Sequence, residues 1–307
     1  VISLDEPLDS ILPELSKIPI LDKNNELLQP KNPITLRQLL THTAGFGYWF
    51  TSKRIRDWDS IKEKLNIKEW DYVDNPRLFE SGSEFMYGTS IHWVGILVEK
   101  LSGQNLEEYF RKNISEPLGM NSTWYNVPEE LRHLIVSSST RDKSTNELIR
   151  NPHQIPEDRK KYNGGGGLFS SPADYGKFLI CMLNKGVYND RTILKSETFD
   201  LMNSPQLDTF KQQHRYVEVG NVDTDARGDK DYFFDNFDNW TLAWGYEESS
   251  KIRPQGTSYW AGFYNTYFTI DYQNGFALLH FTQILPFNDR ESYNLFTDFE
   301  GLVYGTN

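Results

Sequence analysis

Cysteine is nearly absent from this chain, whose 307 residues include only Cys181. A single thiol excludes a disulfide within the chain and is expected to lie buried on a helix. It is compatible with a reducing compartment, which slightly favours the cytoplasm but leaves the localisation open. The sequence also lacks any run of about 18 apolar residues, the length that a membrane-spanning helix requires, so we expect no membrane span.

Basic residues are also fewer than acidic residues. The chain has 32 Lys and Arg against 43 Asp and Glu, which gives a net charge of −11. Because a phosphate backbone would be repelled by such a surface, nucleic acid is not an expected partner.

Motifs for metals and phosphates are missing too. The six histidines show no H-E-x-x-H or other paired-ligand spacing, so no metal site is expected. The glycine run Gly164–Gly167 is not followed by a Gly-Lys-Ser/Thr motif and is interpreted as a backbone turn, because glycine permits unusual φ values. We therefore expect no metal and no organic cofactor.

Aromatic residues, in contrast, are plentiful, with 8 Trp, 17 Tyr and 19 Phe. They allow a large core and an aromatic-lined pocket. In the first two thirds of the chain, helical spacing of apolar residues and capping signals predict helices; Thr35 and Gln38, for example, form a capping box ahead of a leucine-rich turn. The predicted helices cover 35–41, 55–65, 91–101, 106–113 and 172–183.

The last third of the chain changes to the alternation typical of strands. Three strands are predicted over 258–260, 264–271 and 276–282, and a terminal helix over 290–303. Asn274–Gly275 lies between the last two strands and is a hairpin signal. The order predicts an α+β fold in which 1–250 is the mainly helical region and 251–307 supplies strands and the terminal helix of the same domain.

Several segments form a series that runs in order along nearly the whole chain. They are I-T-L-R-Q-L-L-T-H-T-A-G-F at 34–46, P-L-G-M at 117–120, G-G-G-G-L-F-S-S-P-A-D at 164–174 and F-T-Q-I-L-P at 281–286. The series resembles the serine β-lactamase-like and penicillin-binding-protein-like family, most closely its esterase and acyltransferase branch. The resemblance implies a β-lactamase/transpeptidase-like fold, with a helical region and a mostly antiparallel sheet flanked by helices.

The family's first site motif, Ser-x-x-Lys, has no counterpart here. In the family the serine attacks the acyl carbon and the lysine helps to remove its proton, but no serine of this chain is followed by lysine three residues later. Because the family places that helix just before the segment that matches Val1–Leu15, we expect the nucleophile and the first strands in a missing N-terminal segment. The 307 residues alone are therefore expected to fold poorly and to be inactive toward esters.

The second motif, Tyr-x-Asn, corresponds to Tyr87–Gly88–Thr89. The resemblance implies that Tyr87 acts as general base or proton relay, although a phenol with an ordinary pKa near ~10 needs a nearby ammonium to do so. Thr89 replaces the asparagine that would bind a β-lactam side chain, so it is a substrate-contacting position that argues against β-lactams. The alternative for Tyr87 is a loop aromatic packed on the core.

The third motif is Trp260–Ala261–Gly262, where β-lactamases have Lys-Thr-Gly or His-Thr-Gly. It resembles the Trp-Gly-Gly of esterase and acyltransferase relatives, and without a cation it suits a neutral ester better than a carboxylate. The resemblance implies that the three residues contact substrate and that the backbone N–H of Phe263 donates to the oxyanion. Tyr48, after the T-H-T-A-G turn, is a candidate for the acyl pocket, whereas His42 in that turn is expected to be structural.

These motifs together predict a serine hydrolase, most closely a carboxylesterase or acyltransferase that works through an acyl-serine intermediate. Its partner would be a small acyl ester or amide. A β-lactamase or D-Ala-D-Ala peptidase is one alternative, and a non-catalytic member that binds a ligand or partner is another. The acidic stretch 223–238 is expected to be a solvated loop or a lid over the site.

Overall fold

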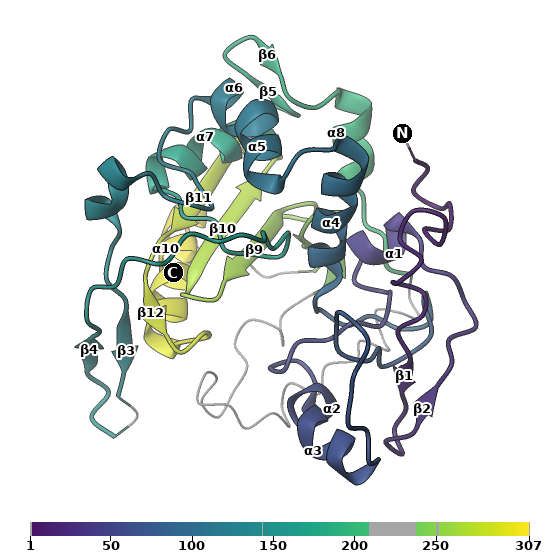
Figure 1. The fold of residues 1–307 in the computed structure, drawn as a ribbon. Helices are drawn as coiled ribbons and strands as arrows, with labels where there is room; N and C mark the ends of the chain where they lie inside the picture. Colours follow the sequence, from purple (N-terminus) through teal and green to yellow (C-terminus); the bar gives the residue numbers. More distant parts are fainter. Residues whose placement is uncertain (1, 143, 209–237, 250–251, 307) are drawn as a thin grey trace. The chain divides into compact units, whose positions relative to one another are not determined.

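The computed structural model describes residues 2–142, 144–208, 238–249 and 252–306. The chain forms two compact units that are interleaved in sequence (Figure 1). Among the described residues, the first contains 2–104, 163–166 and 206–208, and the second contains 105–142, 144–162, 167–205, 238–249 and 252–306. The division at residue 250 that the sequence suggests stays a prediction, and most of the acidic stretch, 223–237, lies outside the described residues.

The regular elements described in the first unit are helices and one small hairpin, joined by long turns and loops. The capping box predicted at Thr35 and Gln38 is confirmed, with both reciprocal hydrogen bonds present. The longest helix of the unit ends at Gly103, whose φ of 69° is the left-handed geometry that favours glycine. The elements are β1 (Ile20–Leu21), β2 (Leu27–Leu28), α1 (Leu36–Leu40), α2 (Lys53–Arg56), α3 (Trp58–Lys64) and α4 (Ser90–Ser102).

Leucine and isoleucine side chains between Leu8 and Ile18 build much of the core of this unit. They pack against α1, α4 and the turn that follows α1, which fixes the loop preceding α4. The fully buried members include Leu8, Leu12, Leu15, Ile18, Ile34, Leu39, Phe46 and Trp93.

The buried arginine Arg77 of the first unit has no carboxylate partner at hydrogen-bonding distance among the described residues. The Arg77 side chain has no solvent exposure, and it donates to the Ile18 carbonyl oxygen at 3.2 Å and to Ser81 Oγ at 2.8 Å. Burial lowers the pKa of its guanidinium to about 10, although the Glu80 carboxylate acts in the opposite direction. The side chain therefore satisfies internal acceptors that water cannot reach.

Arg77→Ala is expected to lower the free energy of unfolding by about 2–5 kcal/mol, because it leaves two buried acceptors without donors and opens a cavity. Urea denaturation measures this. The exposed Arg150 of the second unit provides the control, and Arg150→Ala is expected to stay within about 0.5 kcal/mol of wild type. Equal stability of the two variants would contradict a structural role for the buried guanidinium.

The second unit contains a five-stranded antiparallel sheet in the order β11-β10-β9-β8-β7. The three strands predicted from sequence are confirmed as β9 (Ser258–Gly262), β10 (Thr266–Asp271) and β11 (Phe276–His280). In the register, Trp260 lies opposite Phe268 and Gly262 opposite Thr266. Two further strands, β7 (Asn239–Trp240) and β8 (Gly245–Tyr246), were not predicted, because two residues are too few to show an alternation.

Helices cover both faces of this sheet (Figure 1). Alternate residues of a strand point to opposite faces; Phe268 and Ile270 pack with Leu179 of α7 (Pro172–Leu183), whereas Tyr267 packs with Phe296 of α10 (Arg290–Tyr304). The predicted helices over 172–183 and 290–303 are confirmed. A helix-covered antiparallel sheet of this kind agrees with the predicted α+β class.

Shorter elements complete the second unit. Strand β12 pairs parallel with β3, which pairs antiparallel with β4. The helix predicted over 106–113 is α-helical only for its first turn and continues as a π-helix. The elements are α5 (Leu106–Phe110), η1 (Arg111–Ser115), α6 (Glu116–Leu118), η2 (Glu129–Leu134), β3 (Ser139–Arg141), β4 (Leu148–Arg150), β5 (Val187–Tyr188), β6 (Arg191–Thr192), α8 (Ser196–Met202) and β12 (Ile284–Leu285).

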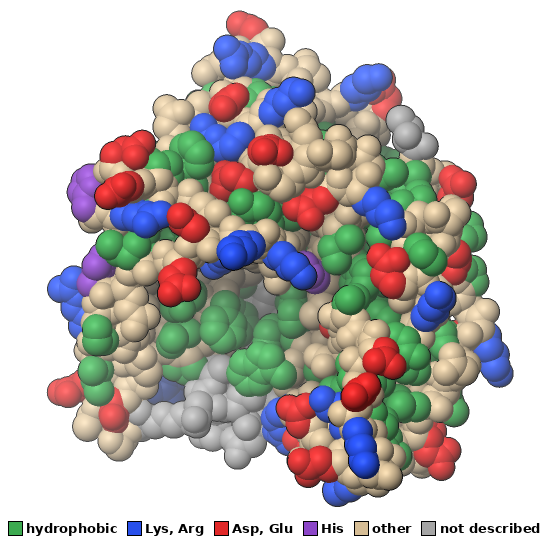
Figure 2. All heavy atoms as spheres, viewed as in Figure 1, with side chains coloured by type: hydrophobic (Ala, Val, Ile, Leu, Met, Phe, Trp, Pro, Cys, Tyr) green, Lys and Arg blue, Asp and Glu red, His purple; other side chains and the backbone are tan. Residues whose placement is uncertain are grey.

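Two surface properties bear on partners. None of the helices within the described part of the chain has the length and apolar character that crossing a membrane requires. On the face drawn in Figure 2, Lys and Arg side chains are interspersed with Asp and Glu. The expectation that nucleic acid is not a partner stays a prediction.

Candidate active site

Tyr87 lies in the loop that leads into α4, and its ring is half-buried between two other rings. Its centroid lies 4.6 Å from that of His42 and 5.4 Å from that of Tyr48. The hydroxyl of Thr51 donates to the Tyr87 carbonyl oxygen at 2.9 Å. Both the ring and the main chain of Tyr87 are therefore held in place, as a proton relay requires.

The next residue, Gly88, can only be glycine. A Cβ atom there would lie 2.2 Å from the Phe46 carbonyl oxygen. Its N–H donates to His42 Nδ1 at 3.3 Å, and burial lowers the pKa of His42 to about 3. The imidazole is therefore neutral near pH 7 and accepts this bond, which agrees with the structural role predicted for His42.

Thr89 follows and precedes the first residue of α4. Its hydroxyl donates to Asp74 Oδ2 at 2.7 Å, and Trp93 Nε1 donates to the same oxygen at 3.0 Å. Asp74 therefore ties the end of the Tyr87 loop to the first turns of α4. The Thr89 hydroxyl proton is used in this bond, so only the lone pairs of the hydroxyl oxygen could bind a ligand. The substrate role of Thr89 stays a prediction. The sequence carries no signal for Asp74, which stands in a polar stretch 15 residues earlier.

Tyr48 belongs to an aromatic group beside Tyr87. It stacks on Phe50 with a centroid distance of 4.9 Å, and Phe50 meets Trp49 edge-on at 5.6 Å. Burial raises the pKa of Tyr48, and the neighbouring Tyr87 and Asp74 raise it further. The hydroxyl therefore stays protonated, as suits a residue that contacts a neutral substrate.

The glycine run lies against the same region. A Cβ atom on Gly164 would lie 2.4 Å from the Ile91 carbonyl oxygen of α4, and one on Gly165 would lie 3.0 Å from Tyr48 Oη. Gly165 N–H is bonded to Asn163 Oδ1 at 2.8 Å. The glycines thus allow close approach of backbone to backbone, which agrees with the predicted turn.

The third motif lies on β9 in the second unit, with β8 on one side and β10 on the other. Trp260 is half-buried and meets Trp240 edge-on at a centroid distance of 4.4 Å. Gly262 ends the strand, and a Cβ atom there would lie 2.2 Å from Thr266 Oγ1. A side chain at this position would therefore require the Thr266 hydroxyl of β10 to move.

A three-residue turn, Phe263 to Asn265, connects β9 to β10. The Asn265 N–H donates to the Gly262 carbonyl oxygen at 3.0 Å, which closes the turn. Phe263 and Tyr264 are 42% and 38% exposed, so the first two turn residues face solvent while Asn265 is fully buried. Phe263, the predicted oxyanion donor, thus stands directly after the strand end.

The structure therefore groups the predicted residues within each unit. Tyr48, Tyr87 and Thr89 lie together in the first unit. The second unit holds the remaining four on one strand and its turn, namely Trp260, Ala261, Gly262 and Phe263. Their roles stay predictions.

The family pattern assigns no nucleophile among the 307 residues, since no serine has lysine three residues later. Cys181 is fully buried on α7, as predicted, and burial raises the pKa of its thiol to about 11, which leaves it protonated at neutral pH. In the described ranges, no three His, Cys, Asp or Glu side chains gather in a way that could hold a metal ion. The expectation of no metal or cofactor stays a prediction.

Comparison with known proteins identifies the family to which the chain belongs. A sequence model described as beta-lactamase matches residues 1–301. The chain is 29% identical over 325 residues to monacolin J acid methylbutanoyltransferase of Aspergillus terreus, covering 99% of this chain and 76% of that protein. It is 33% identical over 216 residues to lovastatin esterase of Penicillium rubens, covering 66% of this chain and 53% of the relative.

A solved structure also resembles this chain over nearly its whole length. Simvastatin synthase from Aspergillus terreus, in a mutant form, superposes with a TM-score of 0.82 at 28% identity, covering 99% of this chain and 75% of that chain. The fold predicted from the motifs is confirmed, and the named relatives are acyltransferases and esterases, as the third motif indicated. Since the family model spans nearly every residue, the chain belongs to the β-lactamase family.

Proposed function

We propose that this chain contributes the proton relay and an oxyanion donor to an enzyme that transfers or hydrolyses acyl groups of small neutral esters. The observation that carries this proposal is the third-motif strand, where Trp260 replaces a cation and Gly262 leads directly into the turn of Phe263. Without a cation, a substrate carboxylate gains no charge-assisted hydrogen bond there.

The chemistry is a two-step exchange through an acyl-serine. In the first step the serine oxygen bonds to the acyl carbon, the ester C–O bond breaks, and the serine proton passes through Tyr87 to the departing alkoxide. In the second step water or an alcohol bonds to the acyl carbon and the serine ester breaks, while the incoming proton returns through Tyr87 to the serine oxygen. The Phe263 N–H stabilises the oxyanion in both steps.

Two features favour esters over β-lactams. The Thr89 hydroxyl donates to Asp74, whereas an asparagine amide at that position would offer a donor to a β-lactam side chain. One relative is named a methylbutanoyltransferase and another an esterase. A carboxylesterase or acyltransferase is therefore the better-supported function, with water and an alcohol as alternative acyl acceptors.

The test uses the protein as its gene encodes it, with p-nitrophenyl butyrate as the ester and nitrocefin as the β-lactam. We expect ester turnover with an acyl mass added to one serine. We expect nitrocefin turnover to be lower by roughly 10- to 100-fold, the value of one lost charge-assisted hydrogen bond. Ester turnover without an adduct, or faster nitrocefin turnover, would contradict the proposal. Absence of both turnover and adduct would favour a non-catalytic member.

A further inference from the structure

The turn that carries Phe263 is fixed by one buried asparagine. Asn265 has no solvent exposure and a φ of 60°, a left-handed geometry that asparagine tolerates better than most residues. Its N–H closes the turn onto the Gly262 carbonyl oxygen at 3.0 Å. The direction in which the chain leaves β9 therefore depends on the conformation of this residue.

The side chain of Asn265 uses its full hydrogen-bonding capacity. Nδ2 donates to the carbonyl oxygens of Ile284 at 2.9 Å and Pro286 at 2.7 Å. Oδ1 accepts from Tyr267 Oη at 2.7 Å and from the Asp289 N–H at 3.0 Å. A primary amide has two donor protons and two acceptor lone pairs, so all four are engaged.

Further hydrogen bonds, from Thr282 and Ile284, hold the carbonyl groups of the same turn. Thr282 Oγ1 lies 2.8 Å from the carbonyl oxygens of both Tyr264 and Asn265. The Ile284 N–H donates to the Tyr264 carbonyl oxygen at 3.2 Å. The two residues after Phe263 are therefore both tied to the segment that contains β12.

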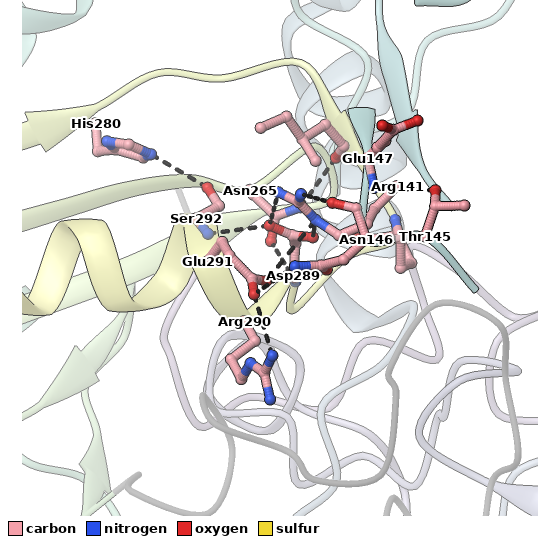
Figure 3. Close-up of polar contacts among 12 residues, drawn as sticks. Arg141, Thr145, Asn146, Glu147, Asn265, His280, Asp289, Arg290, Glu291 and Ser292 are labelled. Carbon is pink, nitrogen blue, oxygen red and sulfur yellow. Dashed lines mark hydrogen bonds and ion pairs between the residues drawn. The ribbon is translucent and has the colours of Figure 1, made fainter. Parts of the chain in front are cut away.

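The Asp289 N–H that reaches Asn265 is itself anchored by an ion pair (Figure 3). Arg141 of β3 donates to both carboxylate oxygens of Asp289, with Nη2 2.9 Å from Oδ1. The same Oδ1 accepts the Ser292 N–H at 3.0 Å and so caps α10. Asp289 is only 4% exposed, and a bidentate pair shielded from water holds its geometry more firmly than a surface pair.

We infer that Asn265 is a positioning residue for the oxyanion donor at Phe263, an inference that rests on the proposed function. An oxyanion donor acts only when its N–H lies about 2.7–3.1 Å from the place where the charge develops. Phe263 and Tyr264 are 42% and 38% exposed, and the Phe263 ring stacks on Phe287 with a centroid distance of 6.4 Å. Because a side chain rotates about its own single bonds, this ring contact does not by itself set the direction of the backbone N–H. The buried amide two residues later supplies the rigidity, through contacts to β10, the β12 segment and the start of α10.

Asn265→Gly is the sharpest test, because glycine keeps the positive φ and removes only the amide. In the gene product, we expect kcat for p-nitrophenyl butyrate to fall about 10- to 100-fold while KM stays within about threefold, since the lost interaction acts in the transition state. The rate of inactivation by a p-nitrophenyl alkylphosphonate, whose adduct resembles the tetrahedral intermediate, should fall in parallel.

Thr282→Val is the second variant, because it removes the hydroxyl that binds the Tyr264 and Asn265 carbonyl oxygens and leaves Asn265 in place. Thr297→Val is the matched control, since its hydroxyl donates to the Asn294 carbonyl oxygen at 3.0 Å within α10 and does not contact the turn. We expect a several-fold loss of kcat for Thr282→Val and an unchanged kcat for Thr297→Val.

The outcomes separate the two proposals. Absence of ester turnover by the wild-type protein would overturn the proposed function and this inference together. Wild-type turnover with an unchanged kcat in Asn265→Gly would overturn the inference alone. If Asn265→Gly shows no cooperative unfolding, Thr282→Val decides: a lowered kcat at constant KM supports the positioning role, and an unchanged kcat overturns it.

Discussion

Tyr87→Phe is expected to lower kcat/KM for ester turnover by roughly 100- to 10,000-fold, the usual contribution of a positioned acid–base group. The change removes only the phenolic oxygen. The ring can keep its contacts with His42 and Tyr48, and the Thr51 bond to the main-chain carbonyl is unaffected. Steady-state kinetics with p-nitrophenyl butyrate and the melting temperature of the variant measure activity and folding separately.

Tyr109→Phe is the matched control for this loss. Tyr109 lies on α5 in the second unit, and its phenol takes no part in the proposed chemistry. We expect this variant to keep the wild-type kcat/KM. A Tyr87→Phe protein that is folded and within threefold of wild type would mean that the serine proton moves by a route that does not include Tyr87.

His42→Asn is expected to remove a large part of the acid sensitivity of the fold. The pKa of His42 is lowered to about 3 by burial, from an ordinary value near 6.5. Between these two values the unfolded chain binds a proton that the folded protein excludes. The stability due to neutral His42 is therefore complete above about pH 6.5 and is lost as the pH falls, by about 1.4 kcal/mol per pH unit, or about 2 kcal/mol at pH 5.

Asparagine is the appropriate replacement because His42 has a φ of 53° and accepts the Gly88 N–H. Asparagine tolerates that backbone geometry and offers an amide oxygen as acceptor. Urea denaturation at pH 7, 6, 5 and 4 should show the stability difference, wild type minus variant, falling as the pH falls. The exposed His133 serves as control, and His133→Asn should leave the pH dependence unchanged. Parallel curves for wild type and His42→Asn would contradict the prediction.

Much of the fold could be predicted because its signals are local. The capping box at Thr35 marks the start of α1, and the Asn274–Gly275 turn separates β10 from β11. Strands β7 and β8 were not predicted because each is two residues long; β8 is held by pairing with β9, and β7 by pairing with β8. Tertiary contacts rather than sequence periodicity place such strands.

In the candidate site, too, the residues with local sequence signals were predicted and those that depend on distant contacts were not. Tyr87–Gly88–Thr89 and Trp260–Ala261–Gly262 are each contiguous, so a motif identifies them. The residues that hold those motifs in place were missed, because their partners are distant in sequence. Arg141 and Asp289, for instance, are 148 residues apart. The weak local signal for Asn265 is that an asparagine follows a strand end and precedes a new aromatic strand, which is typical of a turn with positive φ.

The most direct measurement of the central claim is pre-steady-state acylation followed by mass spectrometry of the intact gene product. With excess p-nitrophenyl butyrate, we expect one butyryl group per protein. We expect it to appear at least about 100-fold more slowly in Tyr87→Phe than in wild type and at the wild-type rate in Tyr109→Phe. A protein that gains no acyl mass while turning over the ester, or a Tyr87→Phe variant that is acylated as fast as wild type, would contradict acyl transfer relayed by Tyr87.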